Sequence, residues 1–344
     1  MRAQVQRGFG GGSAVAIETV DDPKPGPGEV VIAVRACALN RLDLLQQEAA
    51  LVRGFSLPHI AGMDVAGIVT ERADDLPPGI GPAVGDAVLI DPVSTCGVCD
   101  RCTGGLSPYC ENLRTVGSTR PGGFAELVAA PASHSFALPK GMSFVEAATL
   151  PVAAMTAFHA IEAGHFVDGE TVLVNGAGSG VSCALLALLR SRRATVITTA
   201  GGPAKVARAL AVGYHHAIDY RGENVAEVVR SLTEGRGVDL VIDHVGPALF
   251  QQSVDAMAIE GRMVFCGTTT GTEALLSLTS VYHWGRSLIG AGGYLPADFP
   301  RMLSAMAATN VSPVVDSVWP FEQISLAQEK MASGDFFGKI VIEY

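Results

Sequence analysis

The chain has 344 residues, 48% of them hydrophobic and 17% charged, and its formal net charge is -10 at pH 7. This length suits about two domains of typical size, and the negative charge disfavours nucleic acid and anionic membrane surfaces as main partners. The longest apolar stretch of note, residues 147–161, is too short to span a bilayer and contains a proline. Residues 1–20 lack the apolar core and cleavage site of a secretory signal. We therefore expect a cytoplasmic protein.

Four of the seven cysteines follow one another within residues 93–112 with the spacing C-x2-C-x2-C-x7-C, at Cys96, Cys99, Cys102 and Cys110. Short gaps let successive thiolates turn inward on one loop, and the glycines between them make this tight path feasible. Four thiolates around Zn2+ leave no open coordination position, so the segment predicts one structural zinc ion per chain. An iron–sulfur cluster uses the same kind of ligand but fits this spacing less well.

The other three cysteines, Cys37, Cys183 and Cys266, lie among apolar residues. Such positions are typical of packed thiols rather than of metal ligands. Cysteine usage in a cytoplasmic chain of this size does not suggest a disulfide framework.

Residues 165–292 alternate between short apolar runs and helical patterns. The predicted strands lie at 171–176, 194–200, 215–220, 238–246, 261–267 and 287–293, with helical patterns between most of them. Alternation at this pitch predicts a parallel, doubly wound sheet.

A glycine-rich turn, GAGSGVS at 176–182, follows the first of these strands and begins a helix. Such a turn presents backbone N–H groups and a helix N-terminus to a pyrophosphate. Glycine-rich turns are common, and this turn alone is a weak signal. The regular alternation of strands and helices that follows the turn is what favours dinucleotide binding over a simple tight turn.

The end of the second strand bears on the choice of cofactor. An NAD site places a carboxylate here to hold the ribose 2′-OH, but residues 198–202 read TTAGG and contain no acid. Lys205 follows closely, and Tyr220 and Arg221 end the third strand. These residues favour NADP(H) over NAD(H), although Lys205 is also explained as a solvated cation on a helix.

Together these segments resemble the medium-chain dehydrogenase/reductase superfamily of zinc alcohol dehydrogenases and quinone oxidoreductases. The resemblance runs from GEVVIAVRACALNRLDLL (28–45) and LPHIAGMDVAGIV (57–69) to the terminal GKIVIEY. It implies a split, β-rich GroES-like catalytic domain (1–153 and 291–344) with a Rossmann domain (154–290) inserted. It also implies a homodimer or homotetramer acting on a small-molecule substrate.

In zinc alcohol dehydrogenases, three positions bind a second, catalytic zinc, and here they read Asn40, Met63 and Val152. A catalytic zinc needs three protein ligands, so we expect this metal to be lost. Asp64, His59 and His159 are nearby alternatives in the sequence. Another departure is Ser182, where the family commonly has glycine.

Without the metal, the resemblance to zinc-free quinone and enoyl reductases implies hydride transfer from NADPH to an activated double bond or quinone. We expect Asn40 to donate to a substrate oxygen or else to cap the following helix. Asp43 is expected to orient Asn40 or relay a proton, and Met63 and Val152 to line the pocket. The expected cofactor contacts are Arg41, Thr156, Gly176, Gly178, Ser179, Gly180, Val181, Thr199, Gly201, Lys205, Tyr220, Val245, Gly246, Cys266 and Gly267.

Two alternatives stay open at this point. One is an alcohol or aldehyde dehydrogenase with non-standard metal ligands. The other is a non-enzymatic NADPH-binding protein with structural or regulatory duties.

Overall fold

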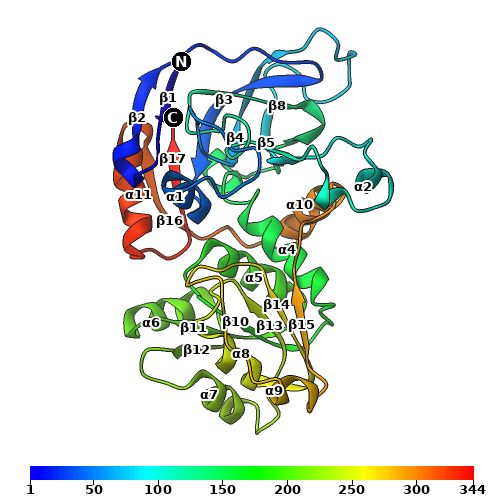
Figure 1. Ribbon diagram of the computed structural model, residues 1–344, viewed down its shortest axis with the longest axis vertical. Helices are drawn as coiled ribbons and strands as arrows, with labels where there is room; N and C mark the ends of the chain where they lie inside the picture. The colour runs from blue at the N-terminus through cyan, green and yellow to red at the C-terminus, as the bar shows by residue number, and fades with distance from the viewer. The chain divides into compact units, whose positions relative to one another are not determined.

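The computed structural model describes all 344 residues, and the chain separates into two compact units (Figure 1). The first unit comprises Met1–Val152, Leu295–Leu303 and Ser312–Tyr344, and we call it the catalytic unit after the domain that the resemblance implies. The second, called the nucleotide unit for the same reason, comprises Ala153–Tyr294 and Ser304–Val311. The sequence-based prediction had placed Ser304–Val311 in the segment that returns to the catalytic domain. No helix is long and apolar enough to cross a membrane.

The catalytic unit is built on a seven-stranded sheet whose main path has the order β16-β17-β3-β4-β5-β9, with β8 also paired to β3. Its strands are β3 (Glu29–Ala38), β4 (Asp64–Arg72), β5 (Ala87–Ile90), β8 (Leu127–Pro131), β9 (Ser135–Ala137), β16 (Val315–Pro320) and β17 (Lys339–Glu343). Strands from both ends of the chain meet here, because β17 lies antiparallel to β3. This is the split β-rich domain that the resemblance implied.

Smaller elements surround this sheet. Two small antiparallel sheets of two strands each are formed by β1 (Arg2–Gln6) with β2 (Val15–Thr19) and by β6 (Val93–Ser94) with β7 (Arg114–Thr115). The helices of this part of the chain are α1 (Arg41–Glu48), α2 (Asp100–Thr103), α3 (Phe144–Ala147) and α11 (Ile324–Ser333). The core includes Ile32, Leu39, Ile90, Phe124 and Phe321, all almost fully buried.

The nucleotide unit contains a six-stranded, fully parallel sheet in the order β12-β11-β10-β13-β14-β15. Its strands are β10 (Thr171–Val174), β11 (Thr195–Ala200), β12 (His216–Asp219), β13 (Val238–Asp243), β14 (Met257–Phe265) and β15 (Ser287–Gly290). The order reverses between β10 and β13, and ligands of such sheets bind outside the carboxyl ends of the strands at this point. The predicted Rossmann class is confirmed.

Five helices connect these strands: α5 (Gly180–Ser191), α6 (Pro203–Val212), α7 (Val225–Leu232), α8 (Phe250–Ala256) and α9 (Thr279–Tyr282). Helix α4 (Ala153–Ala163) precedes β10, and α10 (Asp298–Ala308) follows β15 and belongs to the catalytic unit up to Leu303 and to the nucleotide unit from Ser304. Helix α6 begins with Pro203 in its first turn and ends at Gly213 in the left-handed conformation, the expected start and stop signals. Helix α4 packs against α5, and α7 packs against α8.

Candidate functional site

The four clustered cysteines converge in the loop that follows β6. Neighbouring sulfurs are 3.5 to 3.9 Å apart, and all four lie within 4.8 Å of one another. Zinc–sulfur bonds of about 2.3 Å in a tetrahedron place the sulfurs about 3.8 Å apart, so the residues fit the ion. Backbone N–H groups of Val98 and Cys99 lower the pKa of Cys96 to about 6, which favours the thiolate. A four-thiolate site is closed, and its zinc would brace the loop.

The three positions where the family holds a catalytic zinc lack a ligand set. Met63 is buried and Val152 half-buried, and their side chains offer no charged or imidazole donor. The Asn40 amide is engaged on both sides: Nδ2 donates to Asp64 (2.9 Å), and Oδ1 accepts from Lys339 Nζ (2.8 Å). These residues do not fit the three-ligand site that a catalytic zinc needs.

Asp64 and Lys339 form a buried ion pair, with side-chain exposures of 0% and 7%. Lys339 Nζ is 2.7 Å from Asp64 Oδ2 and also donates to the Leu39 carbonyl (2.7 Å). The other carboxylate oxygen of Asp64 accepts the Val152 N–H (2.7 Å). Both carboxylate oxygens of Asp64 therefore accept hydrogen bonds from protein donors. Sequence reasoning missed Lys339, because in the sequence it is only a cation at the beginning of an apolar strand.

Asp43 lies in the first turn of α1 and is completely buried. Its Oδ2 accepts the backbone N–H of Asn40 (2.7 Å), so it holds the start of the helix. Its Oδ1 has no hydrogen-bond partner. Burial, the largest cause, raises the pKa of Asp43 to about 7. Arg41, the first residue of α1, is exposed, and its expected cofactor contact remains a prediction.

The two histidines weighed as alternative ligands hold backbone carbonyls instead. His59 is buried, and its Nε2 lies 3.1 Å from the Gly117 carbonyl. His159, in the nucleotide unit, has Nε2 2.7 Å from the Ala291 carbonyl. Each ring nitrogen must carry a proton to make these bonds, so both act as donors.

The glycine turn leads into α5 as predicted. Gly176 has φ of 75°, and the N-cap residue Ser179 accepts the N–H of Ser182 (2.9 Å). The N–H groups of Gly178, Gly180 and Val181 make no bond within the protein, as is usual in a first helical turn. Such free donors at a helix N-terminus can hold the phosphates of a dinucleotide.

A buried polar network supports this turn from below. Asn175 Nδ2 donates to Asp243 Oδ1 (2.9 Å) and to Ser253 Oγ (2.8 Å). Thr199, expected among the cofactor contacts, is fully buried, and its hydroxyl accepts the Gly176 N–H (3.0 Å). Thr199 therefore supports the glycine turn, and its expected cofactor contact remains a prediction. Sequence reasoning missed Asn175 and Asp243, although polar residues directly after apolar strands were a signal.

The ends of β13 and β14 carry the other expected contacts. Asp243 accepts the N–H groups of Val245 (3.2 Å) and Gly246 (2.9 Å), which fixes this loop. A Cβ at Gly267 would lie 2.7 Å from the His244 carbonyl, so the close approach of these two segments requires glycine.

Tyr220 and Arg221 lie beside the loop after β11, at the end of the sheet where the adenosine of a dinucleotide is expected. A Cβ at Gly201 would lie 2.6 Å from the Tyr220 hydroxyl and 3.2 Å from Arg221 Nε. Asp219 Oδ1 accepts the N–H groups of Gly202 (2.9 Å) and Arg221 (3.1 Å), so this carboxylate is committed to the loop. Lys205 lies in the first turn of α6, half-buried. A guanidinium and a phenol thus gather where the ribose of a dinucleotide is expected.

A pocket of about 300 Å³ lies within the nucleotide unit, lined by Thr156, His159, Cys266, Ala291, Gly292 and Tyr294. Two predicted cofactor residues, Thr156 and Cys266, meet here from α4 and the end of β14. Burial raises the pKa of the Cys266 thiol to about 12, so it is a neutral wall and not a nucleophile. The segment Ala291–Tyr294, which sequence reasoning missed, completes the pocket.

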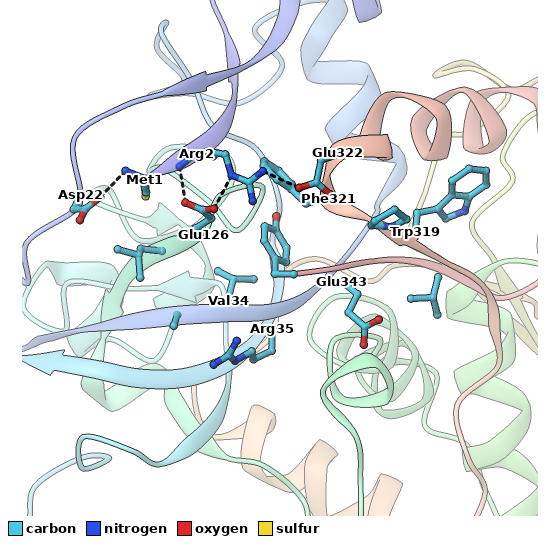
Figure 2. A pocket seen from close by; sticks show the side chains of 15 residues that line it. Met1, Arg2, Asp22, Val34, Arg35, Glu126, Trp319, Phe321, Glu322 and Glu343 are labelled. Atoms are coloured by element: carbon cyan, nitrogen blue, oxygen red, sulfur yellow. Dashed lines mark hydrogen bonds and ion pairs between the residues drawn. The ribbon is translucent and has the colours of Figure 1, made fainter.

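A larger pocket of about 990 Å³ lies in the catalytic unit and contains none of the predicted site residues (Figure 2). Most of its charges pair with each other: Arg2 binds Glu126 and Glu322 (both 2.7 Å), and the amino group of Met1 binds Asp22 (2.6 Å). This mutual pairing leaves little charge to recognise a ligand, and we do not assign the site here.

Comparison with known proteins identifies the family of this chain. A family model described as an alcohol dehydrogenase GroES-like domain matches residues 26–140, and one described as a zinc-binding dehydrogenase matches residues 180–308. A zinc-type alcohol dehydrogenase-like protein of Schizosaccharomyces pombe is 30% identical over 331 residues, covering 93% of this chain and 92% of that protein. The chain belongs to the medium-chain dehydrogenase/reductase superfamily.

Two further similarities fit this assignment. A crystal structure of an NAD-dependent alcohol dehydrogenase superposes with a TM-score of 0.93 at 33% identity, with 100% of both chains covered. The acryloyl-coenzyme A reductase of Metallosphaera sedula is 27% identical over 343 residues, 99% of each chain. Like these members of the medium-chain superfamily, the protein is an oxidoreductase.

Proposed function

We propose that this medium-chain oxidoreductase uses NADPH to reduce an activated double bond or a quinone without a catalytic metal. The cluster of Asn40, Asp64 and Lys339 at the family's metal position carries this proposal. An ammonium group already neutralises Asp64, and the Asn40 oxygen is occupied by the same group. No residue set remains to hold the Lewis acid that simple alcohols and carbonyls need.

A conjugated substrate removes that need. NADPH held at the glycine turn would supply a hydride to the far carbon of the conjugated system and become NADP+. The negative charge would then spread onto the conjugated oxygen, and a proton from water would complete the reduction. A positioned hydrogen-bond donor stabilises such an oxygen in place of a metal. Asn40 donates one Nδ2 proton to Asp64 and retains a second, which we assign to this role. Met63 and Val152 supply apolar wall, and the pocket with Thr156 and Cys266 takes the nicotinamide.

The preference for NADPH is supported by the adenosine end of the nucleotide unit. Residues 198–202 carry no carboxylate, and Arg221 offers a guanidinium suited to a phosphate. The similar structure named an NAD-dependent alcohol dehydrogenase makes NADH the necessary comparison. Titration of the pure protein with both dinucleotides tests this choice, and tighter binding of NADH would refute it.

The reaction class is tested by two measurements on the unaltered protein and one on a variant. Elemental analysis should give one zinc per chain, and steady-state assays with NADPH should show turnover within a panel of enones, enoyl-coenzyme A thioesters and quinones. The relative named acryloyl-coenzyme A reductase makes the enoyl thioesters the first choice. Asn40→Ala should then lower kcat about 100-fold, the usual loss for one oxyanion donor.

Asn224→Ala is the matched control, because Asn224 is also an N-cap asparagine, at α7, and accepts the Glu227 N–H (3.2 Å). It should leave kcat unchanged. Unchanged kcat in Asn40→Ala would remove Asn40 from the mechanism.

The two alternatives give different results. Two zinc ions per chain with turnover of alcohols would support a dehydrogenase with non-standard ligands. Dinucleotide binding without turnover of any substrate in the panel would support a non-enzymatic role.

We also propose a homo-oligomer, dimer or tetramer. The nucleotide unit exposes three large apolar side chains in and before α9: Leu275 (95%), Leu278 (73%) and Tyr282 (74%). Contiguous exposed apolar groups often mark protein contacts. The molar mass in solution tests this, and a monomer at micromolar concentration would refute it.

A further inference from the structure

Two residues that the dinucleotide-binding pattern does not explain meet beneath the glycine turn. Ser182 is the residue that replaces the common glycine, and it is fully buried. Its hydroxyl donates to the Asn175 carbonyl (3.0 Å) and lies 2.9 Å from His244 Nε2. Ser179, the N-cap of α5, completes the group, with its Oγ 2.9 Å from the same nitrogen and 3.1 Å from Ser182 Oγ.

These hydrogen bonds join three segments, two of which are far apart in the sequence. Asn175 directly follows β10, Ser179 and Ser182 form the beginning of α5, and His244 directly follows β13. The His244 ring also lies against the first glycine, since a Cβ at Gly176 would be 3.2 Å from His244 Cε1. The turn is thus fixed from its strand side and its helix side by one imidazole.

A glycine at position 182 would remove every one of the Ser182 side-chain bonds and leave the half-buried imidazole nitrogen with Ser179 Oγ as its remaining partner in this group. A buried polar group that loses its partner costs more than the bond itself contributes. Serine at 182 therefore makes physical sense together with histidine at 244. The Ser182 hydroxyl and the His244 ring nitrogen are hydrogen-bonding partners of each other.

We propose that Ser182 and His244 form a clasp that positions the free N–H groups of Gly178, Gly180 and Val181 for the pyrophosphate of the dinucleotide. His244 is on this view a positioning residue that acts through the turn. The inference rests on the proposed function, because it requires that the turn binds NADPH or NADH.

The test is a double-mutant cycle with Ser182→Gly, His244→Ala and the double variant, read by fluorescence titration with NADPH and NADH. Each single change should weaken dinucleotide binding about tenfold, the effect of losing one or two hydrogen bonds. The double variant should also bind about tenfold more weakly, and not about a hundredfold, because the two residues share their interaction.

Two further readouts separate positioning from general stability. The clasp is expected to contribute equally to cofactor binding in the ground state and in the transition state. Losing it should therefore raise KM for the cofactor and leave kcat within about twofold. His244→Gln places an amide near the position of the imidazole Nε2 and should restore most of the affinity. A purely structural pair would lower Tm in the single variants and leave the dissociation constant of the folded protein unchanged, which would overturn the inference.

Ser191→Gly and His216→Ala are the matched controls. Ser191 ends the same helix, with its hydroxyl on the Leu188 carbonyl (2.7 Å), and His216 is exposed on β12. Both should bind the dinucleotide as the unaltered protein does. If the two substitutions raised the dissociation constant independently, so that the double variant bound about a hundredfold more weakly, the inference would also be overturned. If the unaltered protein binds neither dinucleotide, the proposed function falls and this inference falls with it.

Discussion

The sharpest test of the catalytic unit is the conservative change Asp43→Asn. Burial raises the pKa of Asp43 from 3.8 to about 7. Between these two values the folded protein holds a proton that the unfolded chain has already released. The free energy of unfolding therefore falls as pH rises through this range, and the loss is complete once pH exceeds the folded pKa. Each pKa difference of one unit corresponds to 1.36 kcal/mol.

The shift of about three units sets an upper limit of about 4 kcal/mol on this loss. Between pH 5 and pH 8 the same relation gives about 2.5 kcal/mol. Asparagine cannot titrate, and its carboxamide oxygen can still accept the Asn40 N–H that Asp43 now binds. The variant should therefore lose this part of the pH dependence. Its stability relative to the unaltered protein should rise by about 2.5 kcal/mol from pH 5 to pH 8.

The assay is urea unfolding at pH 5 and pH 8, followed by tryptophan fluorescence in a Trp284→Phe background. The remaining tryptophan, Trp319 in β16, then reports on the catalytic unit alone. Asp86→Asn is the matched control, because exposed Asp86 also accepts a backbone N–H, from Ala83 (2.7 Å). Parallel pH dependence in Asp43→Asn and the unaltered protein would show that Asp43 is ionised throughout, and would refute the reasoning.

Two other substitutions test the charges described above. Asp64→Asn leaves the Lys339 ammonium buried without its counter-charge and should destabilise the catalytic unit by about 3 to 5 kcal/mol, measured by urea unfolding. Asp64→Asn with Lys339→Met should recover most of that loss, and a double variant as unstable as the single one would contradict the assignment. Arg221→Ala should weaken NADPH binding at least about tenfold, as expected for a hydrogen bond to a charged group. NADH binding should not change, and equal losses for the two dinucleotides would place Arg221 away from the 2′-phosphate.

The parts of this protein that could be predicted from sequence are those in which neighbouring residues act together. The spacing of Cys96, Cys99 and Cys102 brings their sulfurs into one loop, and residues of a single turn suffice for the start of α5. The strands of the nucleotide unit follow from short apolar runs, although the predicted strand at 171–176 ends at Val174. Asn175 and Gly176 leave the strand to make the turn, which hydrophobicity alone does not indicate.

The interactions that were missed join residues far apart in the chain. Lys339 lies 299 residues from Asn40 and 275 from Asp64, and His244 lies 62 residues from Ser182. Strand pairing brings them together, since β17 pairs with β3 and β3 with β4. The sequence suggested that Asn40 either caps α1 or donates to a substrate. In the structure, Asn40 is the N-cap residue of α1 and is paired with Asp43 in a capping box, so the capping expectation is confirmed. Its side-chain amide also bonds to Asp64 and Lys339, and its donation to a substrate remains a proposal.

The arrangement around Lys339 also limits which group can act on a substrate oxygen. An ammonium has three protons, and Lys339 Nζ has three acceptors, Leu39, Asn40 and Asp64, at 2.7, 2.8 and 2.7 Å. Donation to a substrate would break one of these buried bonds, at a cost that the substrate bond must first repay. Asn40 faces no such cost, because one of its two amide protons is uncommitted. Lys339 therefore sets the orientation of the Asn40 amide, and the proposed role of donor to the substrate oxygen is assigned to Asn40.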